Sequence, residues 1–107
     1  MEITQTQNAD TCQLDISGEM SIYEAMELKE RLLGALENSR NLEINLSQVS
    51  EIDTVGFQVL VLVKREADQA NKTFHLLTHS EATLDVIDTY HMADFFGDAM
   101  VMPAGNS

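Results

Sequence analysis

The sequence predicts an α/β fold: a mixed sheet of four or five strands with an N-terminal hairpin and helices packed mainly on one face. Three observations support this prediction. Early segments alternate apolar and polar residues as strands do, later segments repeat apolar residues at helical spacing, and the two kinds of segment then alternate along the chain. Strand–helix–strand units place their helices against a sheet, and the opening hairpin argues against an all-parallel arrangement.

The N-terminal segment is expected to form the hairpin. Residues 3–7 and 11–17 have strand-like patterns, and the turn-forming residues 8–10 separate them. In the second strand Cys12 shares one face with aliphatic side chains, so its thiol is expected to be buried. Because Cys12 is the only cysteine, the chain can form no internal disulfide.

The first helix is expected over residues 22–38. Ser21 and Glu24 have the spacing of a capping box, in which each side chain binds a free backbone amide at the helix start. The apolar side chains gather on the half of the helical wheel that should pack on the sheet: Ile22, Ala25, Leu28, Leu32, Leu33 and Leu36. Most of the acidic side chains fall on the other half, which should face water.

The rest of the chain is expected to continue the alternation of strands and helices. The expected elements are a strand at 42–46, a loop at 47–53, a helix at 54–71, a strand at 72–78, a helix capped by Ser80 to about residue 89, an apolar cluster at 90–96 and an edge strand at 99–102. The core stripe of the helix at 54–71 is expected to contain Val59, Leu60, Val63, Ala67 and Ala70, with Val55, Phe57 and Val61 outside it.

Length and charge limit the possible functions. The chain is expected to be a single domain over residues 1–107. Its 18 acidic and 6 basic residues give a formal net charge of −12, which argues against binding nucleic acid and against direct binding to anionic membranes. The N-terminus lacks the pattern of a signal peptide, and the longest apolar run, residues 59–63, is far shorter than the ~20 residues of a membrane span. A cytoplasmic protein is therefore expected.

The sequence contains no pattern typical of a catalytic or metal site. His75, His79 and His91 do not have the spacing of metal ligands, and there is no glycine-rich phosphate loop or serine nucleophile motif. The abundant carboxylates of the first helix lie on its polar face, where solvation explains them. We therefore expect a binding protein rather than an enzyme, with no cofactor and no metal.

The most informative segment, residues 47–56, joins a buried strand to the second helix. Asp53 or Thr54 suits the N-cap position, because either side chain can accept a hydrogen bond from the first helical turn. The Thr54 hydroxyl is expected to be exposed at the positive end of the helix dipole, where a phosphate would be tolerated. Gly56 carries no side chain that would block the approach of another backbone. From these features alone, a plain helix cap is the simpler interpretation.

In this setting the sequence resembles the STAS family, named for sulfate transporters and anti-sigma factor antagonists. In that family a strand ends in Asp-Leu-Ser and a helix then opens with Asp-Ser/Thr-x-Gly, and residues 45–47 and 53–56 match these motifs. Residues 18–21 resemble the Gly-Glu-Leu-Asp element before the first helix, and residues 91–96 resemble a late apolar helix end. The order and length of the elements agree over nearly the whole chain.

The resemblance implies an anti-sigma factor antagonist, a binding module gated by phosphorylation. Stand-alone members bind an anti-sigma factor that is also a Ser/Thr kinase of the histidine-kinase-like ATPase fold; phosphorylation breaks this complex, and a metal-dependent phosphatase restores it. Carried over, Thr54 would be the phosphoacceptor, Asp53 would position it, and Gly56 would let the kinase approach. The candidate partner contacts are Ser50, Glu51, Val55, Phe57 and Val61.

Three departures from the family pattern leave other functions open. Asn45 and Ser21 stand where the family has Asp, and His91 stands where many members have Gly, although none of these changes removes the Thr54 hydroxyl. The chain could instead be a constitutive subunit of a larger complex, such as a lipid-transport ATPase or a stress-signalling scaffold, in which Thr54 is only a contact. A domain that binds a small molecule or nucleotide is the third possibility.

Overall fold

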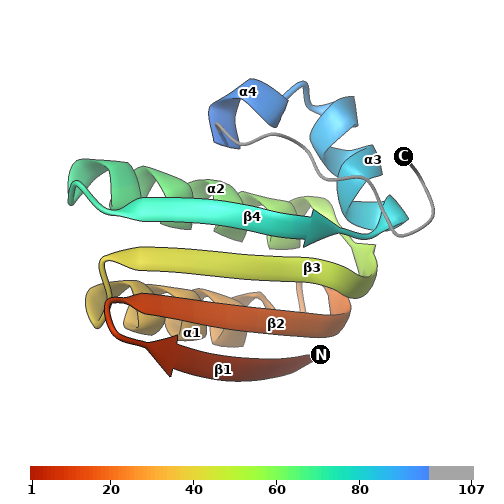
Figure 1. Cartoon of the computed structure of the whole chain (residues 1–107). Coiled ribbons are helices and arrows are strands. Elements are labelled where there is room, and N and C mark those ends of the chain that lie inside the picture. The colour runs from red at the N-terminus through yellow and green to blue at the C-terminus, as the bar shows by residue number, and fades with distance from the viewer. Residues whose placement is uncertain (97–107) are drawn as a thin grey trace.

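The strands form one four-stranded mixed sheet with an N-terminal hairpin, as the sequence predicts. The computed structural model describes residues 1–96 (Figure 1). The strands pair in the order β1-β2-β3-β4; β1 is antiparallel to β2, and the other neighbours are parallel. The elements are β1 (Glu2–Asn8), β2 (Thr11–Met20), α1 (Ala25–Glu37), β3 (Asn41–Ile52), α2 (Thr54–Gln69), β4 (Thr73–His79), α3 (Glu81–Thr89) and α4 (Ala93–Phe96).

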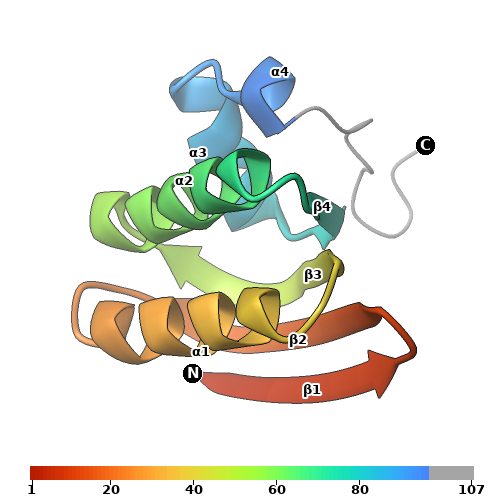
Figure 2. The ribbon, with the colours of Figure 1, turned by 90° about the vertical axis from the view of Figure 1, so that its left-hand side faces the viewer.

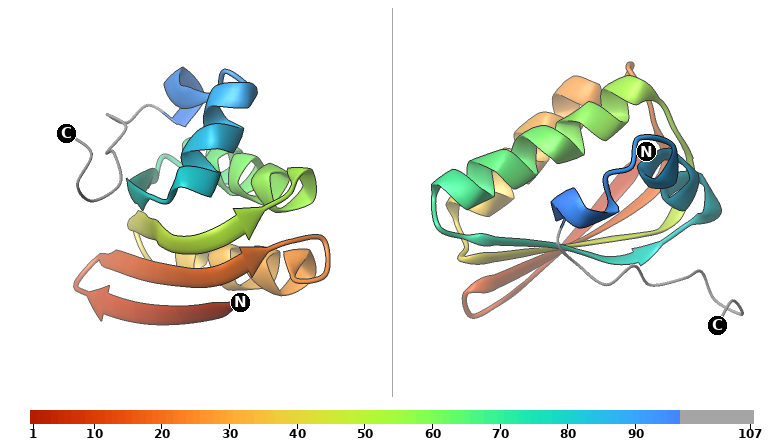
Figure 3. Two further views of the ribbon diagram at one scale, coloured as in Figure 1. Left: turned by 90° about the vertical axis from the view of Figure 1, so that its right-hand side faces the viewer. Right: turned by 90° about the horizontal axis from the view of Figure 1, so that it is seen from above.

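The helices lie mainly on one face of the sheet, which confirms the predicted arrangement. Figure 2 shows α1 and α2 side by side over the strands, and Figure 3 shows α3 and α4 extending this layer near β4. α1 connects the parallel strands β2 and β3, and α2 connects the parallel strands β3 and β4. Because β2 and β3 are parallel, the junctions from β2 to α1 and from β3 to α2 both lie at the carboxyl ends of these strands.

The core is the layer between the sheet and the helices. Alternate side chains of the three parallel strands are buried there: Cys12, Leu14, Ile16, Leu42, Ile44, Leu46, Phe74 and Leu76. Leu28 and Leu32 of α1 and Leu60 and Val63 of α2 are completely buried against them. Cys12 is buried as predicted, and this burial raises the pKa of its thiol, which disfavours the reactive thiolate.

The first helix begins later than predicted. α1 starts at Ala25, and its N-cap residue Glu24 makes no capping hydrogen bond through its side chain. Ser21 and Glu24 bind each other instead of the helix amides, so the predicted capping box does not form. The residues between them form a turn, and Ile22, predicted to lie in the core, is 58% exposed.

β3 is longer than predicted and includes most of the expected loop at 47–53. The strand continues to Ile52 because it pairs in parallel with the second half of β2. Glu19 lies opposite Glu51 and Met20 lies opposite Ile52, after register shifts that break the simple alternation. This irregular pairing explains why the sequence pattern did not reveal the strand. It carries the chain directly to the start of α2.

The later elements agree closely with the prediction. Ser80 caps α3 in a capping box with Thr83: the Thr83 amide donates to Ser80 Oγ, and the Ser80 amide donates to Thr83 Oγ1. Ala70 is exposed rather than buried, because α2 ends at the residue before it. The predicted edge strand at 99–102 lies outside the described residues.

None of the helices within residues 1–96 is both long enough and apolar enough to cross a bilayer.

Candidate functional site

The junction between β3 and α2 holds the residues that the sequence singled out. Ile52 ends the strand, Asp53 is the N-cap residue in an extended conformation, and Thr54 is the first residue of the helix. Thr54 is exposed, as predicted. The junction lies beside the β2–α1 turn, because β2 and β3 are parallel neighbours that end at the same edge of the sheet.

The carboxylate of Asp53 connects the two chain segments at this edge. Oδ1 accepts a hydrogen bond of 2.9 Å from the Gly56 amide, which caps α2, and Oδ2 accepts one of 2.8 Å from the Ile22 amide in the β2–α1 turn. The Asp53 amide also donates to the Met20 carbonyl at 3.2 Å. These bonds from backbone amides, that of Gly56 above all, lower the pKa of the Asp53 carboxyl by stabilising its charged form. Asp53 is therefore ionised at neutral pH.

Gly56 has a different role from the one predicted. It was expected to let a kinase approach, but it is buried and faces the protein's own backbone. A Cβ atom at this position would lie 2.2 Å from the Met20 carbonyl oxygen and 2.9 Å from the carbonyl carbon. The missing side chain therefore allows α2 to pack closely against the end of β2. The motif indicated the need for a glycine, but only the packing shows which backbone approaches it.

The Thr54 hydroxyl has a partner that the sequence did not reveal. Thr54 Oγ1 lies 3.0 Å from the Oη of Tyr90, at the end of α3, and either oxygen can be the donor. The Tyr90 ring stacks on Phe57, with ring centroids 5.2 Å apart and ring planes 12° apart. Tyr90 lay in the apolar cluster expected at 90–96, and nothing in the sequence linked it to the second helix.

The predicted partner contacts divide into exposed and buried residues. Ser50 and Glu51 are exposed at the end of β3, as a contact surface requires. Val55 is half-buried, and the half-buried Val61 packs against the core. Phe57 is only 4% exposed, which makes its prediction as a surface contact wrong. It lies beneath Tyr90, the residue that follows α3, whose ring stacks on it.

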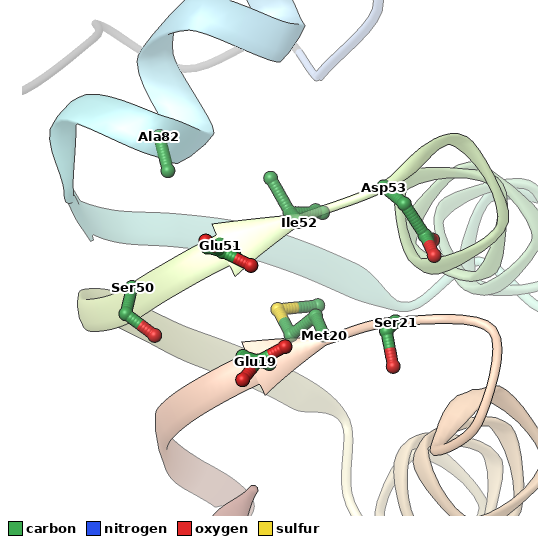
Figure 4. A pocket seen from close by; sticks show the side chains of 8 residues that line it. All are labelled: Glu19, Met20, Ser21, Ser50, Glu51, Ile52, Asp53 and Ala82. Atoms are coloured by element: carbon green, nitrogen blue, oxygen red, sulfur yellow. The ribbon is translucent and has the colours of Figure 1, made fainter.

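A shallow pocket of about 340 Å³ lies beside the junction (Figure 4). The ends of β2 and β3 form its floor, and Ala82 of α3 lies across from them. Glu19 and Glu51, paired on neighbouring strands, and Asp53 give this pocket an acidic lining. Within residues 1–96, no three His, Cys, Asp or Glu side chains are grouped closely enough to hold a metal ion.

The β2–α1 turn and the start of α1 carry exposed apolar side chains. We call Ile22, Tyr23 and Met26 the 22–26 patch; their side chains are 58%, 92% and 69% exposed. The hydrogen bond from the Ile22 amide to Asp53 ties this patch to the residue before Thr54. Sequence reasoning missed the patch because it assigned Ile22 to the buried face of a longer helix.

The family model described as "Mlab, STAS domain" matches residues 3–101. The chain belongs to the STAS family. The "Anti-sigma-B factor antagonist" of Bacillus subtilis (strain 168) is 30% identical to this STAS domain over 88 residues, which are 82% of this chain and 81% of that protein.

Two solved structures have the same fold as this STAS domain. An anti-sigma factor antagonist from Mycobacterium paratuberculosis has a TM-score of 0.81 at 18% identity, with 94% of this chain and 84% of that chain covered. The Bacillus cell fate determinant SpoIIAA in its phosphorylated form has a TM-score of 0.74 at 15% identity, with 97% and 93% covered. The Bacillus subtilis relative and the Mycobacterium structure are both named as anti-sigma factor antagonists, and this STAS domain is similar to them.

Gly56→Ala should destabilise the protein strongly. The added methyl group would overlap the Met20 carbonyl, so α2 must move away from β2, at a loss of about 1–3 kcal/mol in the free energy of unfolding. Gly34→Ala is the matched control, because a Cβ atom at Gly34 in α1 meets nothing within 4 Å. That variant should gain up to about 1 kcal/mol, since alanine favours helix. Urea unfolding measures both changes, and equal effects at the two glycines would contradict the packing role of Gly56.

Asp53→Asn should remove a pH-dependent part of the stability. Because folding lowers the pKa of Asp53, its charge stabilises the folded protein above the unfolded pKa of about 3.9, and this stabilisation is lost as pH falls through the folded pKa. Asparagine still caps a helix but carries no charge. Urea unfolding at several pH values should show the largest difference between wild type and variant near neutrality, shrinking below about pH 4. A difference independent of pH would contradict this role of the carboxylate.

Proposed function

We propose that this STAS domain is a phosphorylation-gated binding protein that sequesters an anti-sigma factor with Ser/Thr kinase activity while Thr54 is unmodified. The observation that supports this most is an exposed hydroxyl on the first residue of α2 in the family's Asp-Thr-x-Gly motif. The 30%-identical Bacillus protein is named as an antagonist of an anti-sigma factor. The structure of SpoIIAA in a phosphorylated form shows that a protein of this fold accepts such a modification.

Phosphorylation at Thr54 would change the surface more than the fold. A phosphate adds about −1.5 to −2 charges, and the free amides and dipole of the α2 N-terminus stabilise negative charge at this position. The surrounding surface is already acidic, with Asp53 next to Thr54 and Glu51 at the end of β3. The domain can therefore keep its structure, whereas a partner that tolerates the uncharged hydroxyl would be repelled.

The 22–26 patch replaces Phe57 as the apolar part of the proposed partner surface. Exposed aromatic and methionine side chains are common at the centres of protein interfaces. Tyr23 is 92% exposed and Met26 is 69% exposed, so both can contact a partner without any rearrangement of the core. Acidic residues surround the patch on the β2–α1 turn and α1, including Glu24 and Glu27. The complementary surface would carry basic groups opposite Glu24 and Glu27 and be apolar opposite Thr54, where a phosphate would lose its hydration without gaining a partner.

The proposal gives the chemistry to the partners and not to this domain. The kinase supplies ATP, magnesium and the base that accepts the Thr54 proton, and a metal-dependent phosphatase later removes the phosphate. This domain contributes the acceptor hydroxyl and the surface around it. It acts as a substrate and binding partner, with no cofactor of its own.

Thr54 should be the residue whose state controls the complex. Immobilised wild-type protein should retain an anti-sigma kinase from lysate of its native cells, and that kinase with magnesium ATP should add one phosphate to the wild type. Thr54→Ala should take no phosphate, whereas Thr54→Ser should keep the reaction. Thr54→Glu should bind at least about a hundredfold more weakly, corresponding to a loss of ~3 kcal/mol.

Intact-mass and binding measurements distinguish this function from a constitutive subunit. A phosphate that persists on Thr54→Ala would contradict the assignment of the acceptor. A complex that keeps its affinity with Thr54→Glu, together with unmodified Thr54 in protein purified from its native cells, would favour a constitutive docking subunit instead.

Truncation of the 22–26 patch should weaken the same complex. Tyr23→Ala and Met26→Ala should each weaken binding roughly tenfold or more, the size expected of interface residues that dominate affinity. Both side chains are exposed, so the free energy of unfolding should change little. Thr6→Ala, at an exposed position in β1 near the hairpin turn, serves as the matched surface truncation. Calorimetric titration with the purified kinase gives the affinities, and unchanged affinity for both patch variants would contradict this surface.

A further inference from the structure

Tyr90 lies directly over the proposed phosphoacceptor. Its phenol oxygen is 3.0 Å from Thr54 Oγ1, although the two residues are 36 positions apart in the chain. Tyr90 is the C-cap residue of α3, and its amide donates to the Val86 carbonyl at 3.1 Å, which fixes its backbone at the helix end. The position of the end of α3 next to the start of α2 therefore decides the surroundings of the Thr54 hydroxyl.

The aromatic stack fixes the position of the phenol. The Tyr90 ring lies nearly parallel to the Phe57 ring, with centroids 5.2 Å apart. Phe57 is itself held edge-on by Phe96 at 6.1 Å, and both of these phenylalanines are buried. Tyr90 is 44% exposed, so its outer side faces water and the ring can turn away without opening the core. The stack on Phe57 therefore holds the Tyr90 ring in place, and the exposed side leaves room for the ring to rotate into solvent.

The hydrogen bond restricts the hydroxyl whichever oxygen donates. If Thr54 donates, its proton is bound to Tyr90 and is not available to a base until that bond breaks. If Tyr90 donates, it occupies one of the two lone pairs of Oγ1 and makes the oxygen a weaker nucleophile. The Thr54 side chain can occupy three staggered rotamers, and the bond to Tyr90 selects the one that places Oγ1 at the phenol.

We propose that Tyr90 is a positioning residue that holds the Thr54 hydroxyl in one orientation and thereby slows its phosphorylation. The inference rests on the proposed function. In the transfer, a bond forms between Thr54 Oγ1 and the γ-phosphorus of ATP, the bond from that phosphorus to the bridging oxygen of ADP breaks, and the hydroxyl proton passes to the base of the kinase. The hydrogen bond between Thr54 and Tyr90 must break before the transfer. Afterwards Oγ1 is an ester oxygen that has no proton to donate to Tyr90.

An NMR measurement on the free protein tests the orientation without any kinase. The three-bond coupling between Hα and Hβ of Thr54 should have the value of one staggered rotamer in the wild type. In Tyr90→Phe, which keeps the ring on Phe57 and loses the phenol oxygen, the coupling should move toward a rotamer average. The same averaged coupling in wild type and variant would overturn the proposal, since the phenol would then not orient Thr54.

The kinetic test uses the anti-sigma kinase retained by the immobilised wild-type protein, with magnesium ATP. Tyr90→Phe should raise kcat for phosphorylation of Thr54 roughly two- to tenfold, the effect of one hydrogen bond, with KM unchanged. Thr89→Val is the control: it removes an exposed hydroxyl from the neighbouring residue and should leave both constants unchanged. A lower kcat would make Tyr90 an aid to transfer and overturn the proposal, and so would an unchanged kcat.

A fluorescence measurement follows the release of Tyr90. The chain contains two tyrosines and no tryptophan, so the difference in tyrosine emission between the wild type and Tyr90→Phe reports on Tyr90. Phosphorylation of both proteins should change this difference, and an unchanged difference would overturn the release of Tyr90. If the wild type takes no phosphate at Thr54, the proposed function fails, whereas the NMR coupling still decides whether Tyr90 orients the hydroxyl.

Discussion

The site depends on one carboxylate that accepts backbone hydrogen bonds from two separate segments. Asp53 closes the first turn of α2 through Gly56 and holds the β2–α1 turn through Ile22. The two bonds explain its lowered pKa and keep its charge in a fixed place next to Thr54. Gly56 is the steric condition for this arrangement, because α2 can reach the end of β2 only without a side chain there. The 22–26 patch and Thr54 are neighbours because Asp53 joins their segments.

In the proposed function, the position of Thr54 at the β3–α2 junction lets phosphorylation add charge without disturbing the fold. The N-terminus of α2 suits a phosphate, because the positive end of a helix dipole favours negative charge. The surface around it is acidic, so the added charge acts on whatever binds there. Tyr90 adds a local control in our inference, since it engages the hydroxyl before modification and is supported by the buried Phe57.

The errors of sequence reasoning share a physical cause. In three of them, a segment is held by a contact with another segment that is distant in the chain. The Ser21–Glu24 spacing indicated a capping box, but the turn before α1 is shaped by the bond from Ile22 to Asp53, 31 residues away. The end of β3 lacks alternation because irregular pairing with β2 holds it. Phe57 lay outside the core stripe of one helix, and only the position of α3 shows what covers it.

The sequence by itself determined the mixed sheet, the order of strands and helices, the cap of α3 at Ser80 and the family motif at residues 53–56, because each depends on residues close together in the chain. Only the tertiary structure decided that Gly56 contacts the Met20 backbone, that Tyr90 binds the Thr54 hydroxyl, and that residues 22–26 leave an apolar patch beside it. Those contacts join segments from different elements. Local periodicity carries no information on which segments meet, because packing of the whole core sets their positions.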